Sequence, residues 1–223
     1  EDPGFTTQYR QDLLVSKDLN FRPTDLEFAP DGSLYVVDWQ NALIGHMQHS
    51  ARDPNRDHEH GRIYRITYPS RPLVKPAEID GASIPQLLEN LKLPEYRSRY
   101  RTRRELRGRD SEAVVKATLK WVSELPKGAD ERLKLEALWV TWGAQKTDFS
   151  LLSELLESSD HRIRAAAVRV LRFNMDRNPF FKNSKKMLLD AANDSHGRVR
   201  MEAVVAASFT NQKNGLEILT TAQ

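Results

Sequence analysis

The C-terminal half of the chain contains an internal repeat. Seven-residue segments at 132–138, 162–168 and 198–204 align without gaps, at offsets of 30 and 36 residues. Each begins with arginine and carries alanine and aliphatic side chains at helical spacing. A unit of this length holds two short helices, and one such pair cannot bury its apolar face alone. The repeat therefore predicts a row of helix pairs in which each pair packs on its neighbours.

Acidic residues mark the starts of these helices. Asp160 and Asp194 precede the second and third segments, where a carboxylate caps free backbone N–H groups and faces the positive end of the helix dipole. The pattern resembles HEAT-like repeats, so we expect an α-solenoid of about three repeats within residues 86–223. Three tryptophans occur in the same helical patterns and are expected in the core: Trp121, Trp139 and Trp142.

The N-terminal part has a different composition. Nine of the eleven prolines lie at or before Pro94, which indicates extended, turn-rich structure there. The turn signal Pro30-Asp31-Gly32 separates two short apolar runs. Four strands are expected in one small antiparallel sheet, at Phe5–Val15, Leu26–Ala29, Leu34–Val37 and Arg62–Thr67.

These features together predict an α+β protein that is mostly α. A sheet domain would occupy residues 1–68, with a long polar loop at 39–61 between two of its strands. A proline-rich linker follows at 69–85 and contains Ser83, the expected cap of the first helix. The HEAT-like helical domain then fills residues 86–223.

Composition and missing motifs exclude several chemistries. The chain has no cysteine, which excludes disulfides, cysteine-ligated zinc, iron–sulfur clusters, covalent c-type haem and thiol catalysis. The motifs of dinucleotide folds, P-loops and serine nucleophile elbows are absent from the sequence. No stretch approaches the roughly 20 apolar residues of a membrane-spanning helix, so no membrane span is expected.

The polar loop is the first candidate site. It contains four of the six histidines, His46, His49, His58 and His60, beside carboxylates such as Asp57. Imidazole and carboxylate groups ligate borderline metals, and imidazole moves protons near neutral pH. Three interpretations remain open: a polar loop braced by neighbouring Arg–Asp pairs, a metal site, or a loop that faces a cofactor or substrate.

The second candidate site is an arginine-rich segment. Arg97–Arg109 holds seven arginines and one glutamate, a charge of +6 in a chain whose net charge is +3. On a helix, Arg97, Arg101 and Arg104 would line one face as anion-binding groups, with Tyr96, Tyr100 and Arg103 close by. Three interpretations remain open: a structural junction between sheet and helices, a site for an anionic partner, or a nucleic-acid site.

Three segments resemble one protein family. Phe21–Thr67, with the string GHMQHSARDPNRDHEHGRI, resembles the end of the propeller in large bacterial proteins classed as membrane-bound dehydrogenases. Pro94–Leu106 and Leu135–Val140 resemble the next region of that family. Its propellers are related to glucose/sorbosone dehydrogenases, which use pyrroloquinoline quinone. A C-terminal domain with a haem-binding CxxCH motif usually follows.

The resemblance implies that the sheet is a single unit like one blade of a propeller. Two arginines contact the quinone in the glucose dehydrogenases; Arg22 matches the first, whereas Thr24 stands in place of the second. In the parent protein, the resemblance implies ligand-facing groups on the loops of this blade, with an imidazole as general base. These candidate residues are Arg22, Asp38, His46, His49, Asp57 and His58.

The sequence therefore predicts an internal, non-catalytic piece of a dehydrogenase-like periplasmic redox protein. Pyrroloquinoline quinone and haem c are expected in the parent and no cofactor in this chain. The helical part would be a scaffold that contacts the rest of the propeller, a haem domain or another protein. The alternatives are a stand-alone protein-binding HEAT module and an anion- or nucleic-acid-binding protein that uses Arg97–Arg109, with nucleic acid the least favoured partner.

Overall fold

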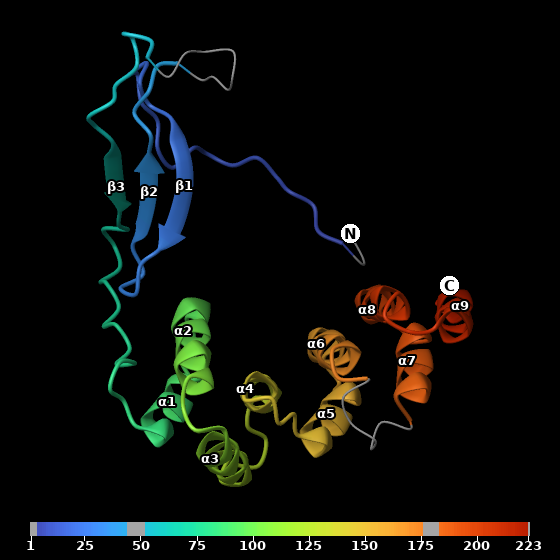
Figure 1. Cartoon of the computed structure of the whole chain (residues 1–223). Coiled ribbons are helices and arrows are strands. Elements are labelled where there is room, and N and C mark those ends of the chain that lie inside the picture. Colours follow the sequence, from blue (N-terminus) through green and yellow to red (C-terminus); the bar gives the residue numbers. More distant parts are fainter. Residues whose placement is uncertain (1–3, 44–51, 176–182, 223) are drawn as a thin grey trace. The chain divides into compact units, whose positions relative to one another are not determined.

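The computed structural model describes residues 4–43, 52–175 and 183–222. The chain forms two compact units, which we describe separately. The sheet unit is Gln8–Glu78, and the helical unit comprises Glu1–Thr7 and Ile79–Gln223. The chain is mostly helical with one small antiparallel sheet (Figure 1), which confirms the predicted class, α+β and mostly α.

The sheet consists of three antiparallel strands in sequence order: β1 (Pro23–Phe28), β2 (Leu34–Asp38) and β3 (Arg62–Ile66). These strands match three of the four predicted ones. The fourth prediction is wrong, because Phe5–Val15 forms no strand. Phe5, Tyr9, Leu13 and Val15 in that segment are exposed, so the segment pairs with no strand and buries little apolar surface.

The turn between β1 and β2 follows the predicted chemistry. Gly32 has a φ of +83°, a conformation that glycine adopts without steric cost. The Asp31 carboxylate accepts hydrogen bonds from the Ser33 backbone N–H and hydroxyl, at 2.9 and 2.6 Å. The Arg65 guanidinium on β3 reaches the same carboxylate at 2.5 Å, so one side chain ties the turn to the third strand.

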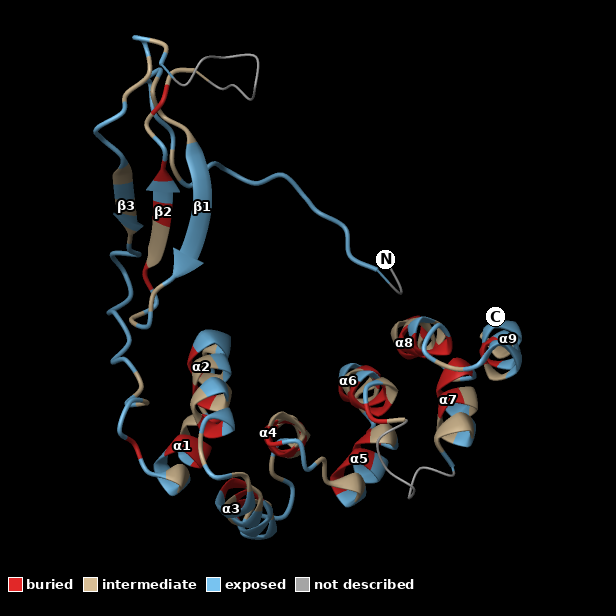
Figure 2. Ribbon diagram, in the orientation of Figure 1, coloured by how far each residue is buried: buried red, intermediate tan, exposed pale blue. Residues whose placement is uncertain are grey.

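The sheet leaves many apolar side chains uncovered. Every residue of β1 is exposed (Figure 2), and Leu26 and Phe28 keep 60% and 51% of their surface accessible. Ile63 on β3 is 67% exposed. Within the described residues of this unit, Val36 is the only apolar side chain in the buried class. The sheet unit therefore has almost no core of its own.

The helical unit contains nine helices in its described residues. They are α1 (Ile84–Asn90), α2 (Tyr96–Arg107), α3 (Ser111–Ser123), α4 (Glu131–Gly143), α5 (Phe149–Leu156), α6 (His161–Arg172), α7 (Ser184–Ala192), α8 (Gly197–Ala207) and α9 (Gln212–Thr221). Ser83 caps α1 as predicted, because its backbone N–H donates to the Gln86 side chain at 2.9 Å in a capping box.

These helices form two rows (Figure 1). Helices α2, α4, α6 and α8 make one row, in which each helix packs on the next. Helices α1, α3, α5 and α7 make the other row, and the buried residues lie mainly where the two rows meet (Figure 2). The three repeated segments of the sequence lie in the first turns of α4, α6 and α8, so equivalent residues occupy equivalent places in the even-numbered row.

The same contact between an arginine and two backbone carbonyls recurs on three helices of the even-numbered row. The Nη1 groups of Arg99, Arg164 and Arg200 each donate to the backbone carbonyls five and six residues earlier, at 2.6 to 3.2 Å. These carbonyls belong to the loops that enter α2, α6 and α8. A guanidinium with five N–H groups suits this work because it satisfies two carbonyls and keeps donors for other partners.

The acidic caps are confirmed in one case and displaced in the other. Asp160 caps α6 and accepts from the Arg162 backbone N–H at 2.8 Å. Asp194 lies two residues before the α8 cap, His196, and accepts from its N–H at 2.8 Å. Arg164 also binds the Asp194 carboxylate at 2.7 and 2.8 Å, so Asp194 joins α6 to α8.

Within the described residues, each helix is too short or too polar to cross a lipid bilayer.

We expect the core of the helical unit to dominate its stability. Leu138 on α4 is fully buried, and Leu138→Ala should lower the free energy of unfolding by about 2–5 kcal/mol, because it removes buried methyl groups and leaves a cavity. Leu216 on α9 is 56% exposed, and Leu216→Ala should cost at most about 0.5 kcal/mol. Urea unfolding followed by far-UV circular dichroism measures both; equal losses would contradict the assignment of the core.

We also expect acid to weaken the start of α6. The hydrogen bond from the Arg162 side chain is the main cause that lowers the pKa of Asp160 from 3.8 to about 2. Because the folded-state pKa is below the unfolded one, the charged form stabilises the fold above about pH 4, and this contribution disappears as the pH falls through about 2. Asp160→Asn keeps a cap acceptor but removes the charge, so its deficit in unfolding free energy should shrink between about pH 5 and pH 2. A deficit independent of pH would contradict this.

Candidate functional site

The polar loop of the sheet unit starts at a buried carboxylate, Asp38. Its Oδ1 accepts from the backbone N–H groups of Arg22 and Gln40, at 2.7 and 2.9 Å, and its Oδ2 accepts from Arg62 Nε at 2.8 Å. Burial opposes its ionisation, but these donors outweigh the effect and hold the pKa of Asp38 below its ordinary value. Both oxygens are engaged in joining β1, β2 and β3, so Asp38 has a structural role here.

The far end of the loop is organised around a second carboxylate, Asp57. It accepts from the backbone N–H groups of Glu59 and His60, each at 3.0 Å, and these bonds lower its pKa. The His60 ring lies 3.1 Å from the same carboxylate, and both His58 and His60 are exposed. Within the described residues no three potential ligands come together as a metal site. His46 and His49 lie outside the described residues.

Arg22, the residue matched to a quinone contact, holds the loop. Its Nη1 donates to the Phe21 carbonyl at 2.7 Å and its Nη2 to the Ala42 carbonyl at 3.1 Å. The described part of the sheet unit therefore brings Arg22 to Asp38 through the backbone and Asp57 to His60. Gln40 links the two carboxylates, because its backbone N–H donates to Asp38 and its Nε2 donates to Asp57 at 3.3 Å.

The arginine-rich segment forms α2, and three small or apolar residues decide how this helix is rotated. Ser98, Thr102 and Leu106 follow one another at i, i+4 and i+8 and are buried. This rotation places Arg104 in a groove, together with Tyr96 and Tyr100. Of the three arginines expected on one face of this helix, Arg104 lines the groove and Arg97 and Arg101 do not; anion binding by that face stays a prediction.

A buried glutamate on α4 joins this helix to α2. Glu136 is fully buried; Arg99 Nε donates to its Oε1 at 2.8 Å, and Arg103 Nη1 donates to its Oε2. Both guanidinium groups are themselves largely covered, with 11% and 14% of their side chains exposed. A charge in such surroundings requires its partners, because water cannot replace them.

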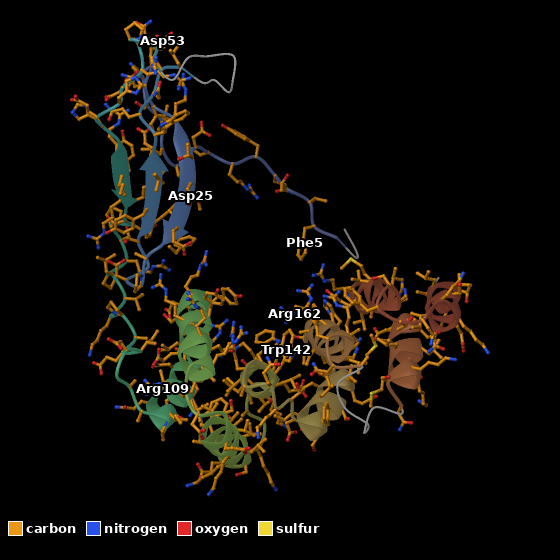
Figure 3. All side chains as sticks on the ribbon, viewed as in Figure 1. Phe5, Asp25, Asp53, Arg109, Trp142 and Arg162 are labelled. Carbon is orange, nitrogen blue, oxygen red and sulfur yellow. The ribbon has the colours of Figure 1, made fainter. Side chains whose placement is uncertain are left out.

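The groove lies on the even-numbered row and has a volume of about 530 Å³. Its described lining combines aromatic rings with guanidinium groups and contains no carboxylate and no imidazole. The aromatic residues are Tyr96, Tyr100, Trp139, Trp142 and Phe173, and the arginines are Arg103, Arg104, Arg107 and Arg169. Trp142 lies between α4 and α6, on the side away from α3 and α5 (Figure 3).

Rings and guanidinium groups stack on one another along the groove. Arg103 lies over the Tyr96 and Trp139 rings, with centroid distances of 5.6 and 4.9 Å. Trp142 stacks on Phe173 at 5.5 Å, so α4 and α6 meet through two aromatic rings. These contacts hold flat apolar surfaces in fixed orientations, which favours binding of a chain that presents apolar or aromatic side chains.

The groove has an uncompensated positive charge. Arg103 shares the single carboxylate of Glu136 with Arg99, and Arg169 donates to Glu202 on α8 at 2.5 Å. Arg104 and Arg107 form no ion pair with any described residue. They therefore favour an anionic group at the α2 end of the groove.

Two groove residues were assigned to the core by their sequence pattern. Trp121 is buried as predicted, and its Nε1 donates to Glu89 at 2.9 Å. Trp139 and Trp142 are half-buried: they pack against the core and also line the groove, so the prediction holds only in part for them. The repeat alignment could have indicated that these two tryptophans reach the surface. They align with Arg169 and Arg172 thirty residues later, so their positions do not require an apolar residue.

We expect the Glu136 cluster to hold the α2 wall of the groove in place. Glu136→Gln leaves two covered guanidinium groups without a countercharge and should lower the free energy of unfolding by about 3 kcal/mol. Glu112, whose side chain is 75% exposed, pairs with Lys146; Glu112→Gln should cost at most about 1 kcal/mol. Urea unfolding of both variants measures the difference, and a loss at Glu136 no larger than that at Glu112 would contradict the role of the cluster.

Comparison with known proteins gives one family match. Residues 3–70, which include the three strands and the polar loop, match the family described as a domain of unknown function, DUF7133. No curated protein and no solved structure matches the chain.

Proposed function

We propose that the helical unit is a HEAT-like α-solenoid that serves as a protein-interaction module, and that its groove holds a segment of a partner protein. The backbone contact that Arg99, Arg164 and Arg200 share supports the solenoid, because stacked repeats reuse one solution. It occurs on α2, α6 and α8, whereas α4 has Lys134 at the aligned position. The two rows of helices are the arrangement expected when each pair contacts only its neighbours.

The observation that carries this proposal is the composition of the groove. A lining of half-buried aromatic rings and arginines is typical of the anchor residues of protein interfaces. Catalysis of proton transfer or acyl transfer would need an activated base or nucleophile in the cavity, and the two tyrosine hydroxyls of the described lining have no carboxylate or imidazole beside them in that lining to activate them. Binding is therefore the activity that this groove supports best.

For the sheet unit, we propose the last blade of a propeller in a dehydrogenase-like periplasmic redox protein. The consecutive antiparallel order of β1, β2 and β3 matches three of the four strands of a propeller blade. The exposed Leu26, Phe28 and Ile63 side chains support it, since neighbouring blades would cover them. Pyrroloquinoline quinone and haem c then belong to the parent protein, in which the helical unit is the scaffold.

A peptide selection tests the proposed binding function. A display library of random peptides is selected on the whole chain, and the enriched peptides are measured by fluorescence anisotropy against wild type and Trp142→Ala. We expect binders that lose about tenfold or more in affinity with Trp142→Ala, since this change removes a central ring of the groove. Lys116→Ala, on the exposed surface of α3, is the control and should leave affinity unchanged. Enriched peptides that bind both variants equally, or a selection without binders, would overturn the proposal.

A further inference from the structure

The repeat places three residues at one equivalent position on the even-numbered helices. Glu136 on α4, Ala166 on α6 and Glu202 on α8 are each the fifth residue of the aligned segments. Glu136 reaches back to Arg99 and Arg103 on α2, and Glu202 reaches back to Arg169 on α6. Both carboxylates are buried, with 0% and 3% of their surface exposed. The same position therefore twice supplies a carboxylate to the preceding helix of the row.

The middle step of the row lacks this carboxylate. Ala166 ends at its methyl group, and it lines the groove between α4 and α6 beside Trp139, Trp142 and Arg169. On α4, Trp139 stands where the alignment puts Arg169 on α6. At this step an alanine replaces the glutamate, and the Trp139 ring replaces the guanidinium that would pair with that glutamate. We call the resulting hollow over Ala166 the notch.

The charges around this notch are positive. Arg103 and Arg169 line the groove, and each has one internal carboxylate partner. Arg104 and Arg107 lie in the same lining without an ion pair to a described residue. A carboxylate that enters the notch finds guanidinium groups with unused N–H donors, and it leaves no charge of its own unpaired.

We propose that the occupant of the groove is an acidic, extended protein segment. One of its Asp or Glu side chains fills the notch over Ala166 and supplies the carboxylate that Glu136 and Glu202 supply at the neighbouring steps. Its other acidic groups meet Arg104 and Arg107, and an apolar side chain packs on the Trp142 and Phe173 rings. This inference rests on the proposed binding function and names the chemistry of the partner.

A protein segment fits these features better than a nucleic acid does. A nucleic-acid strand carries a phosphate at every nucleotide. A site for such a strand would therefore need unpaired cations along the whole even-numbered row. Here Glu136 pairs with Arg103 and Glu202 with Arg169 on the two sides of the notch, so Arg104 and Arg107 are the groove arginines that form no ion pair with a described residue. A short acidic stretch with an apolar residue matches the charge of these two arginines and the rings beside them.

Fluorescence anisotropy with defined peptides tests the inference on the whole chain. The probe is a capped, labelled peptide of four glutamates, two phenylalanines and four glycines, compared with its glutamine-for-glutamate analogue. We expect the acidic peptide to bind at least about tenfold more tightly than the analogue. The double variant Arg104→Ala/Arg107→Ala should lose about tenfold in affinity for the acidic peptide, because two unpaired cations are removed.

The variant Ala166→Glu is the sharpest test. It places in the notch the carboxylate that α4 and α8 already carry at this position, so it should block the acidic peptide by about tenfold or more while far-UV circular dichroism stays unchanged. Ala166→Gln adds a side chain of nearly the same size as Ala166→Glu but without the charge. It therefore shows whether a loss of affinity comes from filling the notch or from charge repulsion of the peptide. Lys116→Glu, on the exposed surface of α3, is the charge-matched control for a general change in net charge and should alter affinity less than about twofold.

The outcomes separate this inference from the proposed function. Equal binding of the acidic and glutamine peptides, still dependent on Trp142, would overturn the acidic partner and leave the binding groove standing. A single-stranded oligonucleotide of equal charge that binds more tightly than the peptide, and depends on Arg104 and Arg107, would overturn it in favour of nucleic acid. Absence of saturable binding of the acidic peptide up to about 1 mM would also overturn it, whatever the display selection yields.

Discussion

The helical unit depends on a carboxylate that is buried between two guanidinium groups. Glu136 has no access to water, so its charge is tolerable only while Arg99 and Arg103 remain in place. Arg99 in turn holds the carbonyls of Leu93 and Pro94, which fixes the loop that enters α2. One ionic cluster thereby positions the helix, its entry loop and the plane of Arg103 between two aromatic rings. The cluster therefore holds the α2 wall of the groove in place.

The sheet unit uses the same principle on a smaller scale. Asp38 is buried and gathers donors from Arg22, Gln40 and Arg62, which belong to three different segments of the chain. The sheet unit buries little apolar surface, so the hydrogen bonds to Asp38 contribute much of what holds its segments together. The contrast with the helical unit is chemical: in the sheet unit Asp38 binds backbone N–H groups and Arg62, whereas in the groove Arg104 and Arg107 form no ion pair with any described residue.

Much of the fold could be predicted because the relevant signals are local or periodic. The turn at Gly32, the cap at Ser83 and the repeated segments depend on backbone sterics, capping and helical spacing, which are readable from the sequence. The rotation of α2 was not predictable in this way, since its buried face consists of Ser98, Thr102 and Leu106, and only one of these is apolar. The groove was missed for the same reason: Trp139 and Trp142 have the character of core residues, and only their alignment with Arg169 and Arg172 places them on a surface.

The central claim is that the aromatic and arginine groove on the even-numbered row binds an acidic segment. The chain has four tryptophans, and their indole N–H resonances report on four separate places in one NMR spectrum. During titration with the acidic peptide, the account predicts that the resonances of Trp139 and Trp142 shift together and saturate. Those of Trp121, hydrogen-bonded to Glu89, and of Trp39 in the sheet unit should stay in place. Shifts confined to Trp39 or Trp121, or no shift at any of the four, would contradict it.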